Sequence, residues 1–123
     1  MVISGSKAGE VVVWQTHGTE LTIRKQHFDH EAMINFIHIN EDMIMYLTCG
    51  LDGAVQVYNL WTDARIRRFT HPKLAPVHSA VLTQTPLPAL CFFSRDDHLW
   101  HSFSLNGSLL DRQKEECSHI IAP

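Results

Sequence analysis

The sequence predicts an all-β protein made of repeated antiparallel sheets. Residues 4–14 begin with a small or polar residue, continue with a turn and end in an alternating strand whose last residue is aromatic. The same pattern recurs at 48–58. Matched positions, such as Gly9 and Gly53 or Trp14 and Tyr58, lie 44 residues apart. Short runs rich in β-branched and aromatic residues fill the space between, bounded by turn residues. No segment requires a helix longer than one turn.

A third copy of the pattern lies at 93–103. Asp96 comes 44 residues after Asp52, although the aromatic residue Phe103 comes one residue late, 45 residues after Tyr58. A period of about 40–45 residues with an aspartate turn before an alternating strand is typical of one four-stranded blade of a β-propeller. Propellers close with about 4–8 blades, and this chain would hold about two to three. We therefore expect an incomplete ring that belongs to a larger protein.

The blades are expected at 1–27 (incomplete), 28–70, 71–114 and 115–123 (the start of a further blade). Within them, alternating strands follow tight turns, and Asp52-Gly53 supplies the positive φ that a hairpin demands. Outer strands alternate apolar with basic residues, as edge strands do, and central strands are nearly all apolar. The alternating strands are predicted at 11–14, 55–58 and 99–103, the outer ones at 21–25 and 64–69, the inner ones at 34–39 and 77–82, and the central ones at 44–48 and 89–93.

Residues at the repeat positions resemble those of the WD40 family. In the second repeat, His30, Thr48 and Asp52 stand at the family's histidine, its buried Ser/Thr and its turn aspartate. Tyr58 replaces the name-giving tryptophan, and Asn59 stands at the aspartate that follows it. The resemblance implies a side-chain hydrogen-bond network that ties the strands of a blade to the loop leading into it.

The other two repeats match this pattern in part. Ser4 and Trp14 match in the first repeat, where Ala8 stands at the aspartate position. In the third repeat His71 and Asp96 match, and Phe92 replaces the Ser/Thr. The resemblance implies structural roles for all the matching residues, namely Ser4, Trp14, His30, Thr48, Asp52, Tyr58, His71 and Asp96.

A narrower resemblance lies near the C-terminus. Residues 91–94 and 101–110, in which Ser-Leu-Asn-Gly precedes a leucine pair, are similar to a divergent WD40 blade of BEACH-domain proteins. This resemblance implies a large cytoplasmic protein in which PH-like and BEACH domains precede a C-terminal propeller, with a role in vesicle and lysosome traffic. Asn106-Gly107 is also the pair that a type I′ hairpin selects, so a purely structural interpretation stays open.

Composition disfavours several classes of partner. A net charge of −3 offers no strong attraction for nucleic acid or acidic membranes. No apolar stretch reaches the roughly 18–20 residues that span a bilayer, so we expect a soluble, cytoplasmic protein with no transmembrane segment. Any membrane association would come through the parent protein. The three cysteines, Cys49, Cys91 and Cys117, form no C-x-x-C and are expected as free thiols.

The nine histidines suggest a metal site, but their spacing argues against one. In the pairs His27/His30 and His98/His101, a spacing of three would place the side chains on opposite faces of a strand, and no third ligand completes either set. The sequence contains no nucleophile elbow, P-loop or G-x-G-x-x-G motif. We expect no metal, no cofactor and no enzymatic activity.

We expect a scaffold that binds other proteins. Trp61 lies in the turn before an outer strand, where an exposed tryptophan is a candidate partner contact, together with Arg65 and Arg67. Packing of Trp61 against a neighbouring blade, and edge protection by the arginines, stay open as alternatives. Trp14 and Trp100 lie in strands and are expected in the core. The alternative fold is a self-contained small β-barrel or sandwich that binds a small apolar ligand.

Overall fold

A computed structural model describes residues 1–84, 88–105 and 109–114, and in this part of the chain every regular element is a β-strand. The strands are β1 (Val2–Gly5), β2 (Val11–His17), β3 (Glu20–His27), β4 (Ile34–Asn40), β5 (Met45–Gly50), β6 (Ala54–Asn59), β7 (Arg65–Thr70), β8 (Ser79–Thr83), β9 (Ala89–Ser94), β10 (Leu99–Ser104) and β11 (Leu109–Lys114). The sequence-based prediction of an all-β chain is confirmed.

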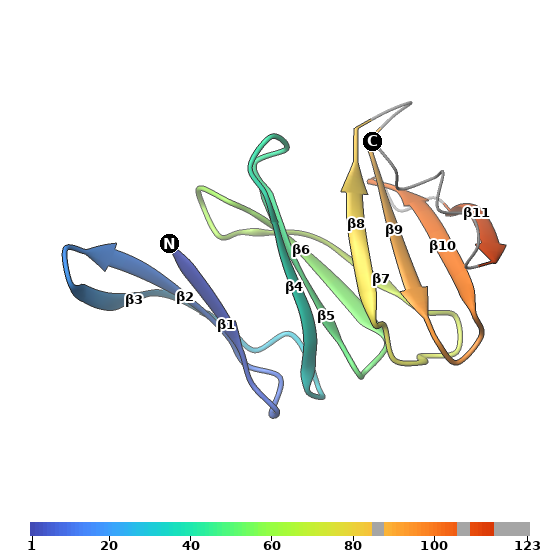
Figure 1. Cartoon of the computed structure of the whole chain (residues 1–123), viewed down its shortest axis with the longest axis horizontal. Coiled ribbons are helices and arrows are strands. Elements are labelled where there is room, and N and C mark those ends of the chain that lie inside the picture. The colour runs from blue at the N-terminus through green and yellow to red at the C-terminus, as the bar shows by residue number, and fades with distance from the viewer. Residues whose placement is uncertain (85–87, 106–108, 115–123) are drawn as a thin grey trace.

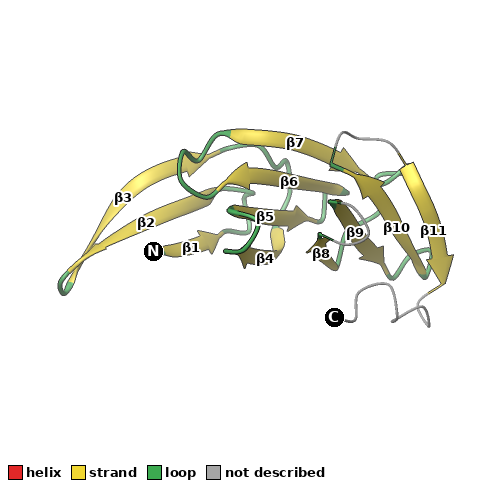
Figure 2. Cartoon of the chain, turned by 90° about the horizontal axis from the view of Figure 1, so that it is seen from above, coloured by secondary structure: helices red, strands yellow, loops and turns green. Residues whose placement is uncertain are grey.

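The strands form three separate antiparallel sheets, ordered β1-β2-β3, β4-β5-β6-β7 and β11-β10-β9-β8. Within each sheet every strand pairs with its neighbour in sequence, so each sheet is a meander of hairpins. The sheets stand side by side along an open arc, with β1, β4 and β8 on its concave side (Figures 1 and 2). This arrangement confirms the predicted incomplete ring and excludes the alternative of a single closed barrel or a two-sheet sandwich for the described residues.

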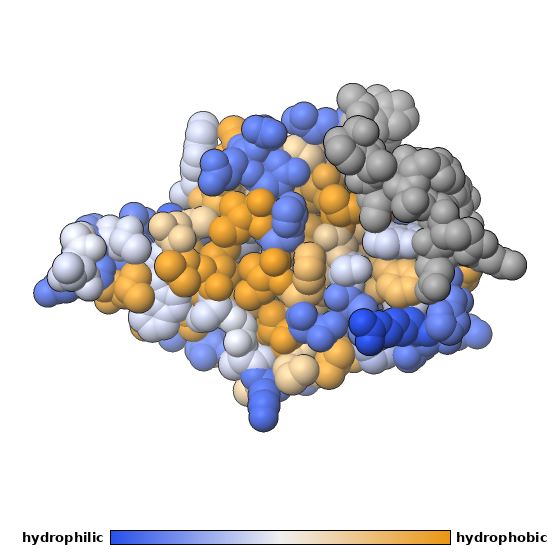
Figure 3. Space-filling view, in the orientation of Figure 1, coloured by the Kyte–Doolittle hydropathy of each residue, from blue (hydrophilic) through white to orange (hydrophobic). Residues whose placement is uncertain are grey.

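The apolar core lies between the sheets. Alternate residues of β5 point to opposite faces, so Tyr46 joins Val13 of the first sheet while Leu47 packs toward the third. The larger cluster joins the second and third sheets and contains Leu47, Cys49, Val55, Val57, Phe69, Val77, Ala80, Leu82, Leu90 and Phe92. On the concave side, apolar side chains also gather over β4 and its neighbours (Figure 3), where every residue of β4 is half-buried.

Equivalent turns within the first and second sheets contact the loop that leads into the next sheet. Gly9 and Gly53 both have positive φ, +93° and +81°. A Cβ atom on Gly9 would lie 2.4 Å from the carbonyl oxygen of His30, and one on Gly53 would lie 2.5 Å from the backbone of Leu74. Only glycine combines this φ with so close a backbone approach. The repeat therefore preserves a contact between the turn of one sheet and the loop that leads into the next.

The outer strands are exposed as expected. Leu21 and Ile23 of β3 are 52% and 53% exposed, and every residue of β7 except Phe69 is exposed. The prediction for two tryptophans was wrong: Trp14 and Trp100 are half-buried rather than in the core. Cys49 and Cys91 are buried, in agreement with the prediction for them, and Cys91 Sγ lies 3.2 Å from Ser102 Oγ.

Some predicted features lie outside the described residues: the Asn106-Gly107 hairpin, Cys117 and the start of a further blade at 115–123. Among the described residues, no helix is long and apolar enough to cross a membrane.

Candidate functional site

A hydrogen-bond network ties the loop before β4 to the second sheet. His30 in that loop lies 3.2 Å through Nδ1 from both carboxylate oxygens of Asp52, and its Nε2 lies 2.7 Å from Thr48 Oγ1. Because a carboxylate only accepts, Nδ1 carries the proton and the Thr48 hydroxyl donates to Nε2. Gly50 makes room, since a Cβ there would lie 2.4 Å from Asp52 Oδ1 and 2.6 Å from His30 Nδ1.

Asp52 also holds the backbone. Its carboxylate accepts the N–H groups of Glu31 at 2.9 Å and Ala54 at 3.1 Å. Burial acts to raise the pKa of Asp52, but the hydrogen bonds from Glu31, His30 and Ala54 outweigh it and lower that pKa. Asp52 is therefore a charged hub that joins the β5–β6 turn to the loop before β4.

Tyr58 extends the network to a residue that the sequence patterns did not single out. Its hydroxyl donates to Asp29 Oδ2 at 2.8 Å, next to His30 in the same loop. Burial and the hydrogen bond with Asp29 raise the pKa of Tyr58 above its ordinary value. In the first sheet, Trp14 Nε1–H donates to Ser4 Oγ at 3.0 Å, so the two predicted residues of that repeat lie together as well.

The third sheet requires a correction, because Asp97 and not Asp96 meets His71. His71 Nε2 lies 2.5 Å from Asp97 Oδ2, whereas the side chain of Asp96 is exposed. The physical reason is the hairpin: β5 and β6 are separated by residues 51–53, but β9 and β10 by residues 95–98. The extra residue moves the aspartate one place along. The late aromatic residue, Phe103, was the signal in the sequence that could have revealed this shift.

Asp97 occupies the same place as Asp52. Its Oδ1 accepts the N–H of Leu99 at 3.0 Å, as Asp52 accepts that of Ala54 two residues on. A second histidine joins it here: His101 Nε2 lies 3.0 Å from Asp97 Oδ2. Burial acts to raise the pKa of Asp97, and the hydrogen bonds with His101 and His71 lower it below its ordinary value.

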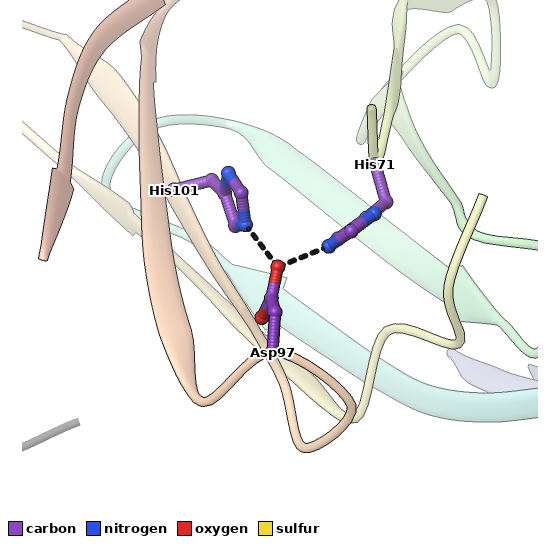
Figure 4. Close-up of side chains that lie close together, drawn as sticks. All are labelled: His71, Asp97 and His101. Atoms are coloured by element: carbon purple, nitrogen blue, oxygen red, sulfur yellow. Dashed lines mark hydrogen bonds and ion pairs between the residues drawn. The ribbon is translucent and has the colours of Figure 1, made fainter. Parts of the chain in front are cut away.

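The three side chains converge from different elements (Figure 4): His71 from the loop after β7, Asp97 from the β9–β10 turn and His101 from β10. The paired-histidine prediction missed this cluster because it looked for ligands within three residues of each other. His98 and His101 do not act together in it; the partner of His101 comes from 30 residues away in the sequence.

A second polar cluster lies at the junction of the first and second sheets. Arg24 of β3 binds both carboxylate oxygens of Asp63 at 2.8 Å and the carbonyl of Leu60 at 3.1 Å. Tyr46 donates to Asp63 at 2.9 Å, and His27 lies 2.9 Å from the Tyr46 hydroxyl. Sequence patterns missed these residues, because the partners come from separate repeats at unrelated spacings.

The junction also fixes protonation states. The hydrogen bond with Asp63 raises the pKa of Arg24, against the opposing effect of burial. Burial lowers the pKa of His27, which stacks on Tyr58 with ring centroids 4.0 Å apart. His27 therefore stays neutral in the folded chain near pH 7.

The predicted partner contacts lie on the surface near this junction. Trp61 is 75% exposed, so it does not pack against a neighbouring sheet in the described chain. Arg65 forms an ion pair with Asp29 at 3.8 Å, and Arg67 is exposed. A polar pocket of about 370 Å³ is lined by Arg65, Asp63 and Phe28, with Lys25, Gln26, His27, Asp29 and Ala64.

The backbone is similar to solved β-propellers. The β-propeller domain of Cps50 (Swd1) from Myceliophteria thermophila gives a TM-score of 0.72 at 18% sequence identity, covering 89% of this chain and 32% of that one. Sqt1 of Chaetomium thermophilum, solved bound to the N-terminus of ribosomal protein L10, gives 0.73 at 15% identity, covering 91% and 30%. The resemblance to WD40 propellers is thus confirmed for the fold.

In sequence, the chain is similar to the BEACH domain-containing protein lvsD of Dictyostelium discoideum. The identity is 29% over an alignment of 87 residues that covers 67% of this chain and 3% of that protein. No family model matches the chain. The chain therefore spans about a third of the similar propeller structures and a small fraction of its curated relative.

Proposed function

We propose that this chain, which has the fold of a WD40-type β-propeller segment, is a non-enzymatic scaffold that binds other proteins as part of a larger protein. Its blades would be 1–27, 28–70, 71–114 and the start of another at 115–123. Rigid sheets held by buried networks present loops and turns at fixed positions, which suits polypeptide recognition. The Sqt1 propeller bound to a ribosomal protein terminus supports this use of the fold by analogy.

The observation that carries the proposal is the surface around Trp61. Phe28, which is 71% exposed, lines the polar pocket, and Trp61, which is 75% exposed, lies two residues before Asp63, another residue that lines it. Exposed aromatic residues of this kind are enriched among the residues that dominate binding energy at protein interfaces. Arg65 lines the pocket, and Arg67 lies exposed two residues further along the same strand.

Trp61 is also held in place. The N–H groups of Trp61 and Thr62 donate to Asn59 Oδ1 at 2.8 and 3.0 Å, which fixes the β6–β7 turn. A fixed backbone reduces the entropy lost when the side chain is immobilised by a partner. Trp61 is therefore the residue to test first.

The finer proposal is that the parent protein is of the BEACH type and acts in membrane traffic from the cytoplasm. The lvsD match and the residues 91–94 and 101–110 support it. An antibody raised to this chain should then detect, in its own cells, a band far above 14.1 kDa. A band at that mass would contradict the larger-protein proposal.

Affinity capture tests the scaffold proposal. The tagged chain, its Trp61→Ala variant and a matched Leu21→Thr variant, which trims another exposed apolar side chain, are compared by quantitative mass spectrometry after circular dichroism has confirmed the fold of each. We expect Trp61→Ala to deplete specific proteins at least about tenfold, as loss of a hot spot does, while Leu21→Thr retains them. Equal capture by all three proteins would contradict a role for Trp61.

A further inference from the structure

We propose that His71, Asp97 and His101 form a binding site for a divalent transition-metal ion of the Zn²⁺ class, a property separate from the scaffold role. The three candidate ligand atoms, Nε2 of both histidines and a carboxylate oxygen of Asp97, all lie within 4.8 Å of one another. Both rings point at Asp97 Oδ2, at 2.5 Å from His71 and 3.0 Å from His101 (Figure 4).

The cluster is enclosed on one side and open on the other. The side chains of His71 and His101 are 3% and 2% exposed, whereas that of Asp97 is 27% exposed. A pocket of about 250 Å³ reaches the group and is lined by His71, Asp97, His101, Pro72, Lys73 and Leu99. Buried imidazoles fix two ligands, and the pocket gives an ion a route to them.

Comparison with the second sheet shows that His101 is an imidazole which that sheet lacks. Gln56 of β6 occupies the position of His101: it pairs across the hairpin with Thr48, as His101 pairs with Phe92 at the equivalent place. In the second sheet the histidine bonds the aspartate and also Thr48, whereas Phe92 stands at the position of Thr48 in the third sheet. The third sheet adds a second imidazole nitrogen to the same carboxylate oxygen.

This donor set selects a class of ion. Two imidazoles and one carboxylate with an open fourth position are typical of zinc sites, whereas Mg²⁺ and Ca²⁺ prefer sets made only of oxygen atoms. Ligands about 2.0–2.1 Å from a tetrahedral Zn²⁺ lie about 3.3–3.4 Å from each other. The two hydrogen-bonded pairs must therefore separate by less than about 1 Å when the ion replaces the protons between them.

One hydrogen bond opposes the ion and limits its affinity. The N–H of Lys73 donates to His71 Nδ1 at 3.0 Å, so the Nε2 of His71 carries the ring proton. Coordination through Nε2 requires that proton to leave and Nδ1 to gain one, which breaks the bond to Lys73. Metal-bound histidines usually donate from this nitrogen to an acceptor, and loss of such a partner costs about 10–100-fold in affinity. We therefore expect moderate rather than tight binding.

The test is calorimetric titration of the full chain with ZnCl₂ after chelator treatment and dialysis. His101→Gln introduces the residue found at the equivalent position of the second sheet, Gln56. The variant should therefore keep the fold and remove one ligand. His17→Gln is the matched control, because His17 is an exposed histidine in another sheet. We expect one ion per chain for the unaltered chain and for His17→Gln, and at least tenfold weaker binding for His101→Gln.

Two results would overturn the proposal: no saturable binding by the unaltered chain, or binding by His101→Gln as strong as that of His17→Gln. Should His101→Gln fail to fold, nitrogen NMR of the histidine rings decides the question in the unaltered chain. Zinc must then shift the ring nitrogens of His71 and His101 and leave those of His17 in place, and unchanged His71 and His101 signals would refute the site.

Discussion

Replacing Asp52 with alanine removes the hub that joins the β5–β6 turn to the loop before β4. The carboxylate accepts hydrogen bonds from His30 and from the backbone N–H groups of Glu31 and Ala54. The side chain of His30 is fully buried, and that of Asp52 is 7% exposed. Alanine therefore leaves a buried imidazole N–H without its acceptor.

The expected cost is worked out contact by contact. A buried donor that loses its partner costs about 1–3 kcal/mol, and this applies to His30. The N–H of Ala54, also buried, adds about 1 kcal/mol, while water replaces the acceptor at the exposed Glu31. The variant no longer buries a charged carboxylate, and this gain offsets part of the sum. We therefore expect the free energy of unfolding to fall by about 2–3 kcal/mol.

Urea unfolding followed by circular dichroism measures the change. Asp96→Ala is the matched control, because Asp96 lies 44 residues after Asp52 but is exposed, and its unfolding free energy should change by less than about 0.5 kcal/mol. Folding lowers the pKa of Asp52 from 3.8, so its contribution is complete above that pH and is lost as the pH falls through the folded-state pKa. A change near zero for Asp52→Ala, or an equal loss for Asp96→Ala, would refute the reasoning.

Three further changes are measured by the same unfolding assay. Gly53→Ala should lower the free energy of unfolding by at least about 2 kcal/mol, because φ is +81° and the new Cβ meets the backbone of Leu74. Gly18→Ala, where φ is +62° and nothing lies close, should lower it by about 1 kcal/mol, and equal losses would count against the close-contact argument. Asp63→Asn should cost about 2 kcal/mol, since Arg24 loses its charged partner at the sheet junction, and a neutral result would mean that the pair is not needed there. Burial lowers the pKa of His27 from 6.5, so below that pH the unfolded chain binds a proton that the folded chain does not. The free energy of unfolding should therefore fall on acidification from pH 7.5 to 5.5, by at most about 1.4 kcal/mol per pH unit. His27→Gln should show a smaller pH dependence than the unaltered chain, and an unchanged slope would contradict this assignment.

Periodicity accounts for what the sequence could predict. Local strand and turn signals repeated every 44 residues, and this was enough to predict the sheets, whereas the structural roles of His30 and Asp52 were implied by the resemblance to the WD40 family. The same periodicity misplaced the aspartate of the third sheet, because a hairpin longer by one residue shifts every later position. The aspartate that occupies the structural place is Asp97.

The same reasoning could not predict contacts between repeats. Arg24 and Asp63 lie 39 residues apart and belong to different sheets, so no fixed spacing links them. His71 and His101 meet only because a loop from one side and a strand from the other share one carboxylate. Such meetings depend on how the sheets pack, and packing is a property of three-dimensional geometry that local patterns do not encode.

The location of the core between the sheets has a consequence for how the chain can be divided. A cut after Thr70 would leave Leu47, Val55 and Val57 on one fragment and Leu90 and Phe92 on the other, each without the surface that buries it. Two such fragments would carry complementary halves of one hydrophobic interface. The burial of the core on either side of that cut therefore depends on the other side.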